Sequence, residues 1–240
     1  ITVVLNSIAM WKQEARNPKL TSRSLPHTSF AEAWQTFSRA GRAKRLLVAV
    51  GLGTAGFSMQ DILLEPFGGQ VFGMSVGQTT WLTATLAAGT LTGFALSARK
   101  LGRGGDPYRL ASLGLLVGIA AFAGVIFSPL LNLSAVFQTS SFFIGLGSGL
   151  FSVGMLTAAM DLASSGSGAV SGFALGAWGG VQATAAGMAV GVSGMLRDGI
   201  SGLAVHGDLG AAFSGPSGGY VVVYQIEIVL LFATLAVIGP

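Results

Sequence analysis

The chain has 240 residues, of which 9% are charged, 51% are hydrophobic and 37 are glycine. Water-soluble domains carry charge on roughly a quarter of their residues, so this composition excludes a soluble globular protein. There are 13 basic and 9 acidic residues, and no cysteine is available for a disulfide or a thiol site.

Long stretches of the chain contain no Asp, Glu, Lys or Arg at all. The longest are residues 66–98, 110–160 and 162–196. A helix crosses the bilayer in about 20 apolar residues, so the longer stretches must hold more than one crossing. The runs also lack the period-two alternation of a transmembrane β-barrel. The sequence therefore predicts an all-α membrane protein.

Residues 1–10 form an apolar run that has no initiator methionine and no basic residue. The run is too short to span a membrane and lacks the basic start of a signal peptide. We interpret it as the end of a preceding transmembrane helix, and the chain as the C-terminal part of a longer protein.

Residues 11–44 are predicted to be a basic cytoplasmic segment that contains an amphipathic helix over about 29–42. Ser29 and Glu32 form a capping box, which is a helix-start signal. Aromatic residues then recur at helical spacing and cations follow, as in a helix that lies in the lipid headgroup layer. The alternative is a short soluble helix that packs on the protein's own cytoplasmic ends. The aromatic residues are Phe30, Trp34 and Phe37.

Residues 45–240 are predicted to form a bundle of six transmembrane helices. The expected spans are about 45–66, 78–98, 109–127, 131–159, 168–196 and 219–239. Segments 11–45 and 99–109 hold every one of the 13 basic residues except Arg197. Cytoplasmic loops are enriched in Lys and Arg, so both segments are expected to be cytoplasmic, and residues 199–218 to lie on the other side.

Glycines four residues apart recur along the predicted spans. This spacing puts both glycines on one helix face and allows close approach of a second backbone. Helix packing is the expected role, and the dense run at 172–191 indicates either a helix buried among others or a surface that moves. The pairs are Gly89/Gly93, Gly114/Gly118, Gly145/Gly149, Gly172/Gly176/Gly180 and Gly187/Gly191.

Four acids fall in or near these spans, where an ionised carboxylate is costly. Asp61 and Glu65 are four residues apart and predicted to share a helix face, next to Gln60 and before Pro66. Asp161 is interpreted as a surface residue at a helix end.

Glu227 lies well inside the last span, with no basic residue at similar depth, and Gln182 is a candidate partner. These positions give the candidate binding residues for a pigment or a protein partner. They are Gln60, Asp61, Glu65, Gln182 and Glu227.

No catalytic or metal site is expected, and the sequence predicts that the protein is not an enzyme. The two histidines, His27 and His206, lie in predicted loops on opposite sides of the membrane. No nucleophile–base pair and no metal-ligand spacing is visible.

The sequence resembles the PucC/LhaA family of photosynthetic bacteria. The resemblance rests on GFSMQDILLEPFGGQ at 56–70 and FGMSVG at 72–77, with support from 11–16 and 88–93. It implies the six-helix C-terminal half of a twelve-span protein of the major facilitator type. The implied location is the bacterial inner, intracytoplasmic photosynthetic membrane.

The same resemblance implies a chaperone-like assembly factor for light-harvesting complexes. Its expected partners are antenna polypeptides, the absent N-terminal six-span half and lipid, with no nucleic acid. Bacteriochlorophyll is the candidate cofactor. No histidine lies in a predicted span, so a pigment magnesium would take an oxygen ligand such as Glu227 or Glu65, or the antenna polypeptides would supply the ligand.

Two other functions stay open. A transporter of a pigment or pigment precursor would need polar groups at mid-depth, and only Glu227 and Gln182 qualify. A pigment-synthesis enzyme fits less well, because a prenyl transferase needs acid clusters for magnesium diphosphate and none is present.

Overall fold

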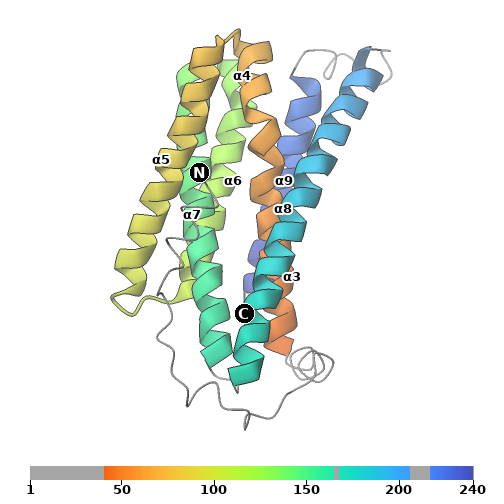
Figure 1. The fold of residues 1–240 in the computed structure, drawn as a ribbon. Helices are drawn as coiled ribbons and strands as arrows, with labels where there is room; N and C mark the ends of the chain where they lie inside the picture. The colour runs from red at the N-terminus through yellow and green to blue at the C-terminus, as the bar shows by residue number, and fades with distance from the viewer. Residues whose placement is uncertain (1–40, 165–167, 206–216, 240) are drawn as a thin grey trace, which may run out of the picture.

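The computed structural model describes residues 41–164, 168–205 and 217–239. Every regular element in this part of the chain is a helix, and Figure 1 shows the helices side by side in one bundle. The predicted helix end at 1–10 and the predicted interfacial helix at about 29–42 lie almost entirely outside the described residues. In chain order the elements are α3 (Gly41–Ser58), η1 (Met59–Ile62), α4 (Leu64–Phe72), α5 (Val76–Leu101), α6 (Pro107–Leu131), α7 (Ser134–Ser164), α8 (Gly168–Val205) and α9 (Gly218–Ile238).

Four of these helices, α5, α6, α7 and α9, are long and apolar enough to cross a membrane. The segment from α3 to α4 counts as a fifth candidate span that is bent by 45°. The 38-residue α8 is not among the candidates, because its glycines and Gln182 add little hydropathy. The described chain is thus an all-helical membrane protein with four to five candidate spans. Each predicted span range falls on these elements, and 168–196 falls on α8.

The first span is broken rather than continuous, contrary to the prediction of one helix over 45–66. A 3-10 turn, η1, separates α3 from α4, and the chain continues as helix to Phe72. Pro66 explains the break, since proline lacks an N–H and its ring clashes with the carbonyl four residues earlier, here that of Ile62. Pro66 therefore lies in the first turn of a new helix, α4, whereas the predicted span ended at residue 66.

Proline has the opposite outcome in α6, which continues through Pro129 to Leu131. A proline at this position leaves the carbonyl of Val125 without its usual helical donor. The hydroxyl of Ser128 donates to that carbonyl at 2.7 Å. The hydrogen bond lost to proline is thereby replaced within the helix, as apolar surroundings require.

Short capped turns connect the helices. The side chain of Asp106 accepts hydrogen bonds from the backbone N–H groups of Tyr108 (2.8 Å) and Arg109 (3.2 Å), which starts α6. Ser75 and Gln78 form a capping box at the start of α5. These caps satisfy backbone donors that a helix start leaves free.

Glycines hold α7 very close to α5 and α6. A Cβ added to Gly93 would lie 2.7 Å from the carbonyl oxygen of Leu146, and one added to Gly149 would lie 2.6 Å from that of Thr90. On the other side of α7, a Cβ on Gly114 would lie 2.5 Å from the oxygen of Gly147. The predicted packing role is confirmed for the glycine pairs of α5, α6 and α7.

The glycines of α8 behave differently. An added Cβ would meet no atom within 4 Å at Gly176, Gly180, Gly187 or Gly191. Helix α8 instead packs through its other face, where Ala189 is buried. The prediction that this helix is buried among others is therefore wrong for the described residues, and the alternative, a surface that moves, stays a prediction.

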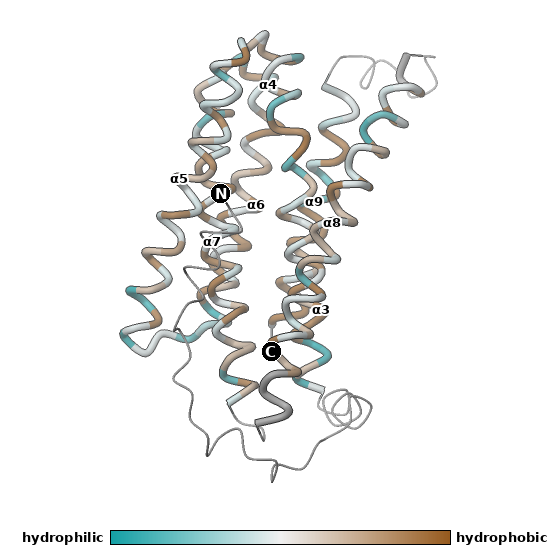
Figure 2. The backbone as a smooth tube through the Cα atoms, viewed as in Figure 1, coloured by the Kyte–Doolittle hydropathy of each residue, from teal (hydrophilic) through white to brown (hydrophobic). Residues whose placement is uncertain are grey.

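Aromatic side chains fill the core at the end of the bundle that carries α4. Phe67 lies at its centre, with ring centroids 5.1 Å from Phe137, 5.3 Å from Tyr220 and 5.5 Å from Tyr224. Figure 2 shows apolar stretches along the length of the helices, and many of the large apolar residues are exposed on the outside. Leu130 is 78% exposed, for example. Such surfaces are expected of helices that face lipid.

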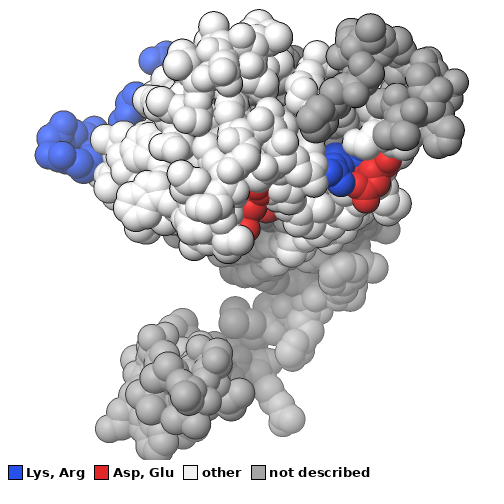
Figure 3. All heavy atoms as spheres, turned by 90° about the horizontal axis from the view of Figure 1, so that it is seen from above, with Lys and Arg blue, Asp and Glu red and all other residues white. Residues whose placement is uncertain are grey.

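Basic residues gather at the end of the bundle opposite α4. The α5–α6 turn and the start of α3 are both at this end of the bundle (Figure 1), and Arg42, Arg45 and Tyr108 line one pocket there. The guanidinium of Arg45 also donates hydrogen bonds to the carbonyls of Val237 and Ile238, which end α9. Figure 3 looks onto the opposite end, where uncharged surface covers most of the near face.

Candidate functional site

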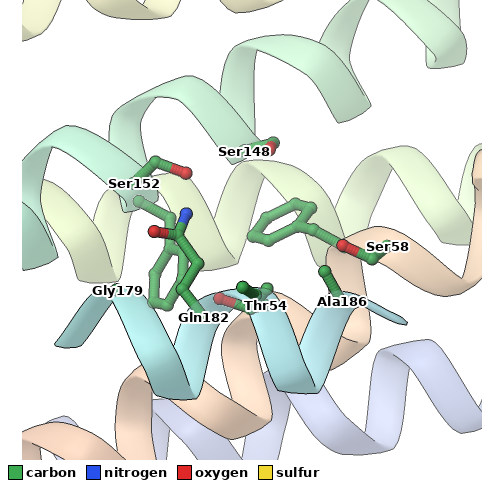
Figure 4. Close-up of a pocket in the computed structure, with 10 residues that line it drawn as sticks. Thr54, Ser58, Ser148, Ser152, Gly179, Gln182 and Ala186 are labelled. Carbon is green, nitrogen blue, oxygen red and sulfur yellow. The ribbon is translucent and has the colours of Figure 1, made fainter. Parts of the chain in front are cut away.

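A polar pocket of about 250 Å³ lies between α3, α7 and α8 (Figure 4). Figure 4 shows the side chain of Gln182 on α8 extending toward Ser152 on α7. The phenyl rings of Phe57 and Phe151 are part of the lining. The full lining is Thr54, Phe57, Ser58, Ser148, Phe151, Ser152, Gly179, Gln182, Ala183 and Ala186.

The pocket follows from spacing along three helices. Thr54 and Ser58 are four residues apart on α3, and Ser148 and Ser152 are four residues apart on α7. Each pair therefore lies on one helix face. On α8, glycine and alanine flank Gln182 and leave the space open. Several hydroxyl groups and one amide converge on the same cavity.

The pocket offers hydrogen bonds but no charge. None of its lining residues is ionisable, so it contains no general acid, general base or electrostatic anchor. Hydroxyl and amide groups beside two aromatic rings suit a neutral ligand that has carbonyl or ester oxygens. Of its polar residues, only Gln182 was predicted from the sequence. The paired hydroxyls at four-residue spacing were the signal that could have identified the others.

Gln60 and Asp61 lie together in η1, at the break in the first span. The side-chain amide of Gln60 donates to a carboxylate oxygen of Asp61 at 2.8 Å. Glu65 follows in α4 and accepts a hydrogen bond from the hydroxyl of Thr83 on α5 at 2.6 Å. The two acids do not lie on one continuous helix, because the break at Leu63, between η1 and α4, separates them. Asp61 and Glu65 therefore do not share one helix face as predicted. Asp61 contacts Gln60, and Glu65 contacts Thr83.

Glu227 lies in the middle of α9 and has no exposed surface. Neither of its carboxyl oxygens has a hydrogen-bond partner among the described residues, and the same holds for the hydroxyl of Tyr224 one turn earlier. Gln182, the candidate partner, lines the polar pocket and forms no hydrogen bond with Glu227. The predicted pair is therefore not formed in this structure.

A cluster around Arg197 ties three helices together near the α4 end. Its guanidinium donates to the side-chain oxygen of Gln70 on α4 at 2.7 Å and to the hydroxyl of Tyr220 on α9 at 2.8 Å. It also pairs with Asp198 at 2.6 Å and lies 4.7 Å from the centre of the Tyr220 ring. The sequence pattern singled out Arg197 as an isolated cation but did not indicate these partners.

The sites thus fall into three separate places. Gln182 belongs to the polar pocket, Glu65 faces α5, and Gln60, Asp61 and Glu227 lie where η1 meets α9. Asp161 is exposed at the basic end, as predicted. The structure does not bring the five predicted site residues into one binding site.

Comparison with known proteins gives a consistent match. The family model described as PUCC protein matches residues 1–240. The chain is 53% identical over 241 residues to an uncharacterized protein of the puhA-bchM intergenic region of Rhodobacter capsulatus, covering 100% of this chain and 50% of that protein.

Two further relatives carry the name Protein PucC. The one from Rhodovulum sulfidophilum is 50% identical, over 82% of this chain and 43% of its own length. The one from Cereibacter sphaeroides is 44% identical, over 98% of this chain and 50% of its own length. The chain therefore spans about half the length of the curated relatives it matches.

Proposed function

The chain belongs to the PUCC protein family, and on that premise we propose that it acts in the assembly of photosynthetic light-harvesting complexes. The observation that carries the proposal is the family match over residues 1–240. Within that role, the chain contacts antenna polypeptides and hands bacteriochlorophyll to them. Its place is the bacterial inner membrane, with the basic end of the bundle in the cytoplasm.

The apolar outer surfaces support contact with antenna polypeptides. Trp81, Leu91 and Phe127 are each more than half exposed on α5 and α6. Side chains of this kind pack against lipid or against another transmembrane helix. An assembly factor needs such a surface because its partners are themselves membrane helices.

The polar pocket supports a transient contact with pigment. Its hydroxyl and amide groups fit the ester and carbonyl oxygens of a chlorin, and its two phenylalanine rings fit an aromatic macrocycle. The described part of the chain supplies no histidine for the pigment's magnesium. Ligation by the antenna polypeptides is consistent with handing over pigment rather than storing it.

We propose the same fold for the chain as for half of a major-facilitator-type protein. The chain spans about half the length of its relatives, and its described helices form one bundle (Figure 1). The open glycine face of α8 would receive the other half, since small residues permit close helix contact. The function proposed is non-catalytic, in keeping with a pocket that lacks ionisable groups.

A transporter of a pigment or pigment precursor is the second candidate function. The observation that favours it is a polar pocket between three helices, which is where a substrate site of such a protein would lie. Transport would require the pocket to open alternately to both sides of the membrane. Assembly requires only that the partner reach it from within the membrane.

Deletion of the gene tests the proposed function. We expect the deletion strain to lose most of the antenna absorbance, and the full-length protein to restore it. Purification in mild detergent should recover antenna polypeptides with the restored protein. Normal antenna absorbance without the protein would refute the assembly role, and recovery of free pigment without antenna polypeptides would favour the transporter.

A further inference from the structure

Glu227 is buried in surroundings that offer its carboxyl group no neutralising partner. It has no exposed surface, and neither oxygen accepts or donates a hydrogen bond among the described residues. Two other polar groups in the core of the bundle also lack a hydrogen-bond partner among the described residues. The hydroxyl of Tyr224 and the side-chain oxygen of Gln60 are both buried and unpartnered in the described part of the chain.

The helices packed against α9 provide no cation to Glu227. On α3 the basic residues are at the basic end of the bundle, and Arg45 there bonds the end of α9. On α6, Tyr108 and Arg109 lie in the first turn, at that same end. On α8, Arg197 is engaged by Gln70, Tyr220 and Asp198. On α4, Glu65 bonds Thr83 of α5.

The element that packs against α9 beside Glu227 carries another acid, Asp61. Asp61 belongs to η1, and η1 contacts α9, the helix that carries Glu227. Unlike Glu227, Asp61 is exposed, and its carboxylate accepts the amide of the buried Gln60. The break in the first span thus places an exposed acid next to a buried one.

An ionised carboxylate cannot persist in such a place without compensation. Burying an unpaired charge costs at least several kcal/mol, and a second negative charge nearby adds to the cost. A neutral carboxylic acid avoids most of this cost. The packed surroundings of Glu227 therefore favour the protonated form of its carboxyl group.

We propose that Glu227 is a proton-binding site in the membrane, loaded while α9 packs against α3 and η1, with Asp61 as the group that exchanges the proton with the surroundings. Release of the proton requires the contact between α9 and η1 to open. The packed conformation binds the proton more tightly than the open one, so lower pH favours packing and higher pH favours opening. This site is separate from the polar pocket and does not depend on the proposed assembly role.

The hydrophobic reagent dicyclohexylcarbodiimide tests the proposal, because it modifies protonated carboxyl groups in apolar surroundings. The full-length protein in detergent would be treated between about pH 6 and about pH 9, and the modified residue identified by mass spectrometry. We expect Glu227 to be modified, at a rate that falls by about tenfold per pH unit once its proton is lost. Modification that is equally fast across the range would show a permanently neutral structural acid and overturn the proposal.

Two variants and one ion complete the test. The variant Asp61→Asn removes the neighbouring negative charge, so loss of modification should shift to lower pH; an unchanged pH profile would contradict the role of Asp61. Glu227→Gln keeps the side chain neutral, so it should remove the modification and reduce the pH dependence of thermal unfolding. Replacing choline with sodium at constant pH should have no effect, and protection by sodium would overturn the proton in favour of a metal cation.

Discussion

Arg197 shows how a single residue joins helices that are distant in the sequence. Its partners Gln70 and Tyr220 lie on α4 and α9, and the hydroxyl of Tyr220 also donates to Gln70 at 2.9 Å. Hydrogen bonds that involve a charged group are stronger than neutral ones, and more so where water is excluded. This cluster is therefore expected to stabilise the α4 end of the bundle.

Replacing Arg197 with Gln should lower the stability of the protein in detergent by about 1–3 kcal/mol, because Gln70 and Tyr220 lose a charged partner. Thermal unfolding followed by the loss of the monodisperse peak in size-exclusion chromatography would measure the change. Arg103→Gln is the matched control, since Arg103 is exposed in the α5–α6 turn. Equal stability of the two variants would show that the cluster contributes nothing.

Residues of the polar pocket can be tested in the same way for function. Ser148→Leu would fill part of the cavity and should reduce antenna absorbance several-fold while the protein still accumulates. Thr92→Leu is the control, because Thr92 is exposed on α5 and bonds only its own helix. Absorbance and protein level would be measured in cells of the deletion strain that carry each variant. A normal antenna level with Ser148→Leu would exclude the pocket from the assembly role.

The acids within the spans could be predicted from the sequence, but the residues that contact them could not. The acids Asp61, Glu65 and Glu227 could be identified because charge is rare and costly in apolar spans. Their partners could not, since Thr83 meets Glu65 only through the turn between α4 and α5. Gln182 is recognisable from the sequence as a polar residue within an apolar span, but the residues that surround it in the pocket depend on how α3, α7 and α8 are arranged.

At the scale of elements, the close contact of α7 with α5 and α6 depends on glycine. The backbones approach until a single methyl group would collide, as at Gly149 against Thr90. Spacing alone predicted these contacts on three helices but also predicted them for α8, where Gly187 meets no atom within 4 Å. A small-residue pattern shows that a helix face can accept a neighbour, and it does not show whether one is present.

Replacing Gly149 with Ala should destabilise the bundle by about 1–3 kcal/mol, because the added methyl group would lie 2.6 Å from the carbonyl of Thr90 and force α5 and α7 apart. Gly77→Ala makes the same chemical change in α5 where no atom lies within 4 Å. That control should be neutral or slightly stabilising, since alanine favours helix over glycine. Thermal unfolding in detergent measures both, and a Gly149→Ala protein as stable as the control would contradict the packing role.

At the scale of the whole molecule, the helical class and the positions of the helices follow from the charge-free stretches. The break in the first span could not be predicted from these stretches, because it depends on local backbone geometry before Pro66. They also do not show whether α8 crosses the membrane, because its hydropathy is marginal and the answer depends on what surrounds the helix. The number of membrane crossings depends on α8, which is not among the candidate spans. Whether residues 217 and 103 lie on opposite sides of the membrane depends on whether α8 crosses it.

The absence of cysteine makes this question directly testable, since a cysteine introduced into these 240 residues is their only thiol. Arg103→Cys lies in the α5–α6 turn and Ser217→Cys precedes α9. If α6, α7 and α8 all cross, three crossings separate the two sites, and a membrane-impermeant maleimide added to intact spheroplasts should label Ser217→Cys but not Arg103→Cys. Permeabilised spheroplasts provide the control, because both variants should then be labelled. Labelling of both or of neither in intact spheroplasts would mean that α8 does not cross, and labelling of Arg103→Cys alone would reverse the predicted orientation.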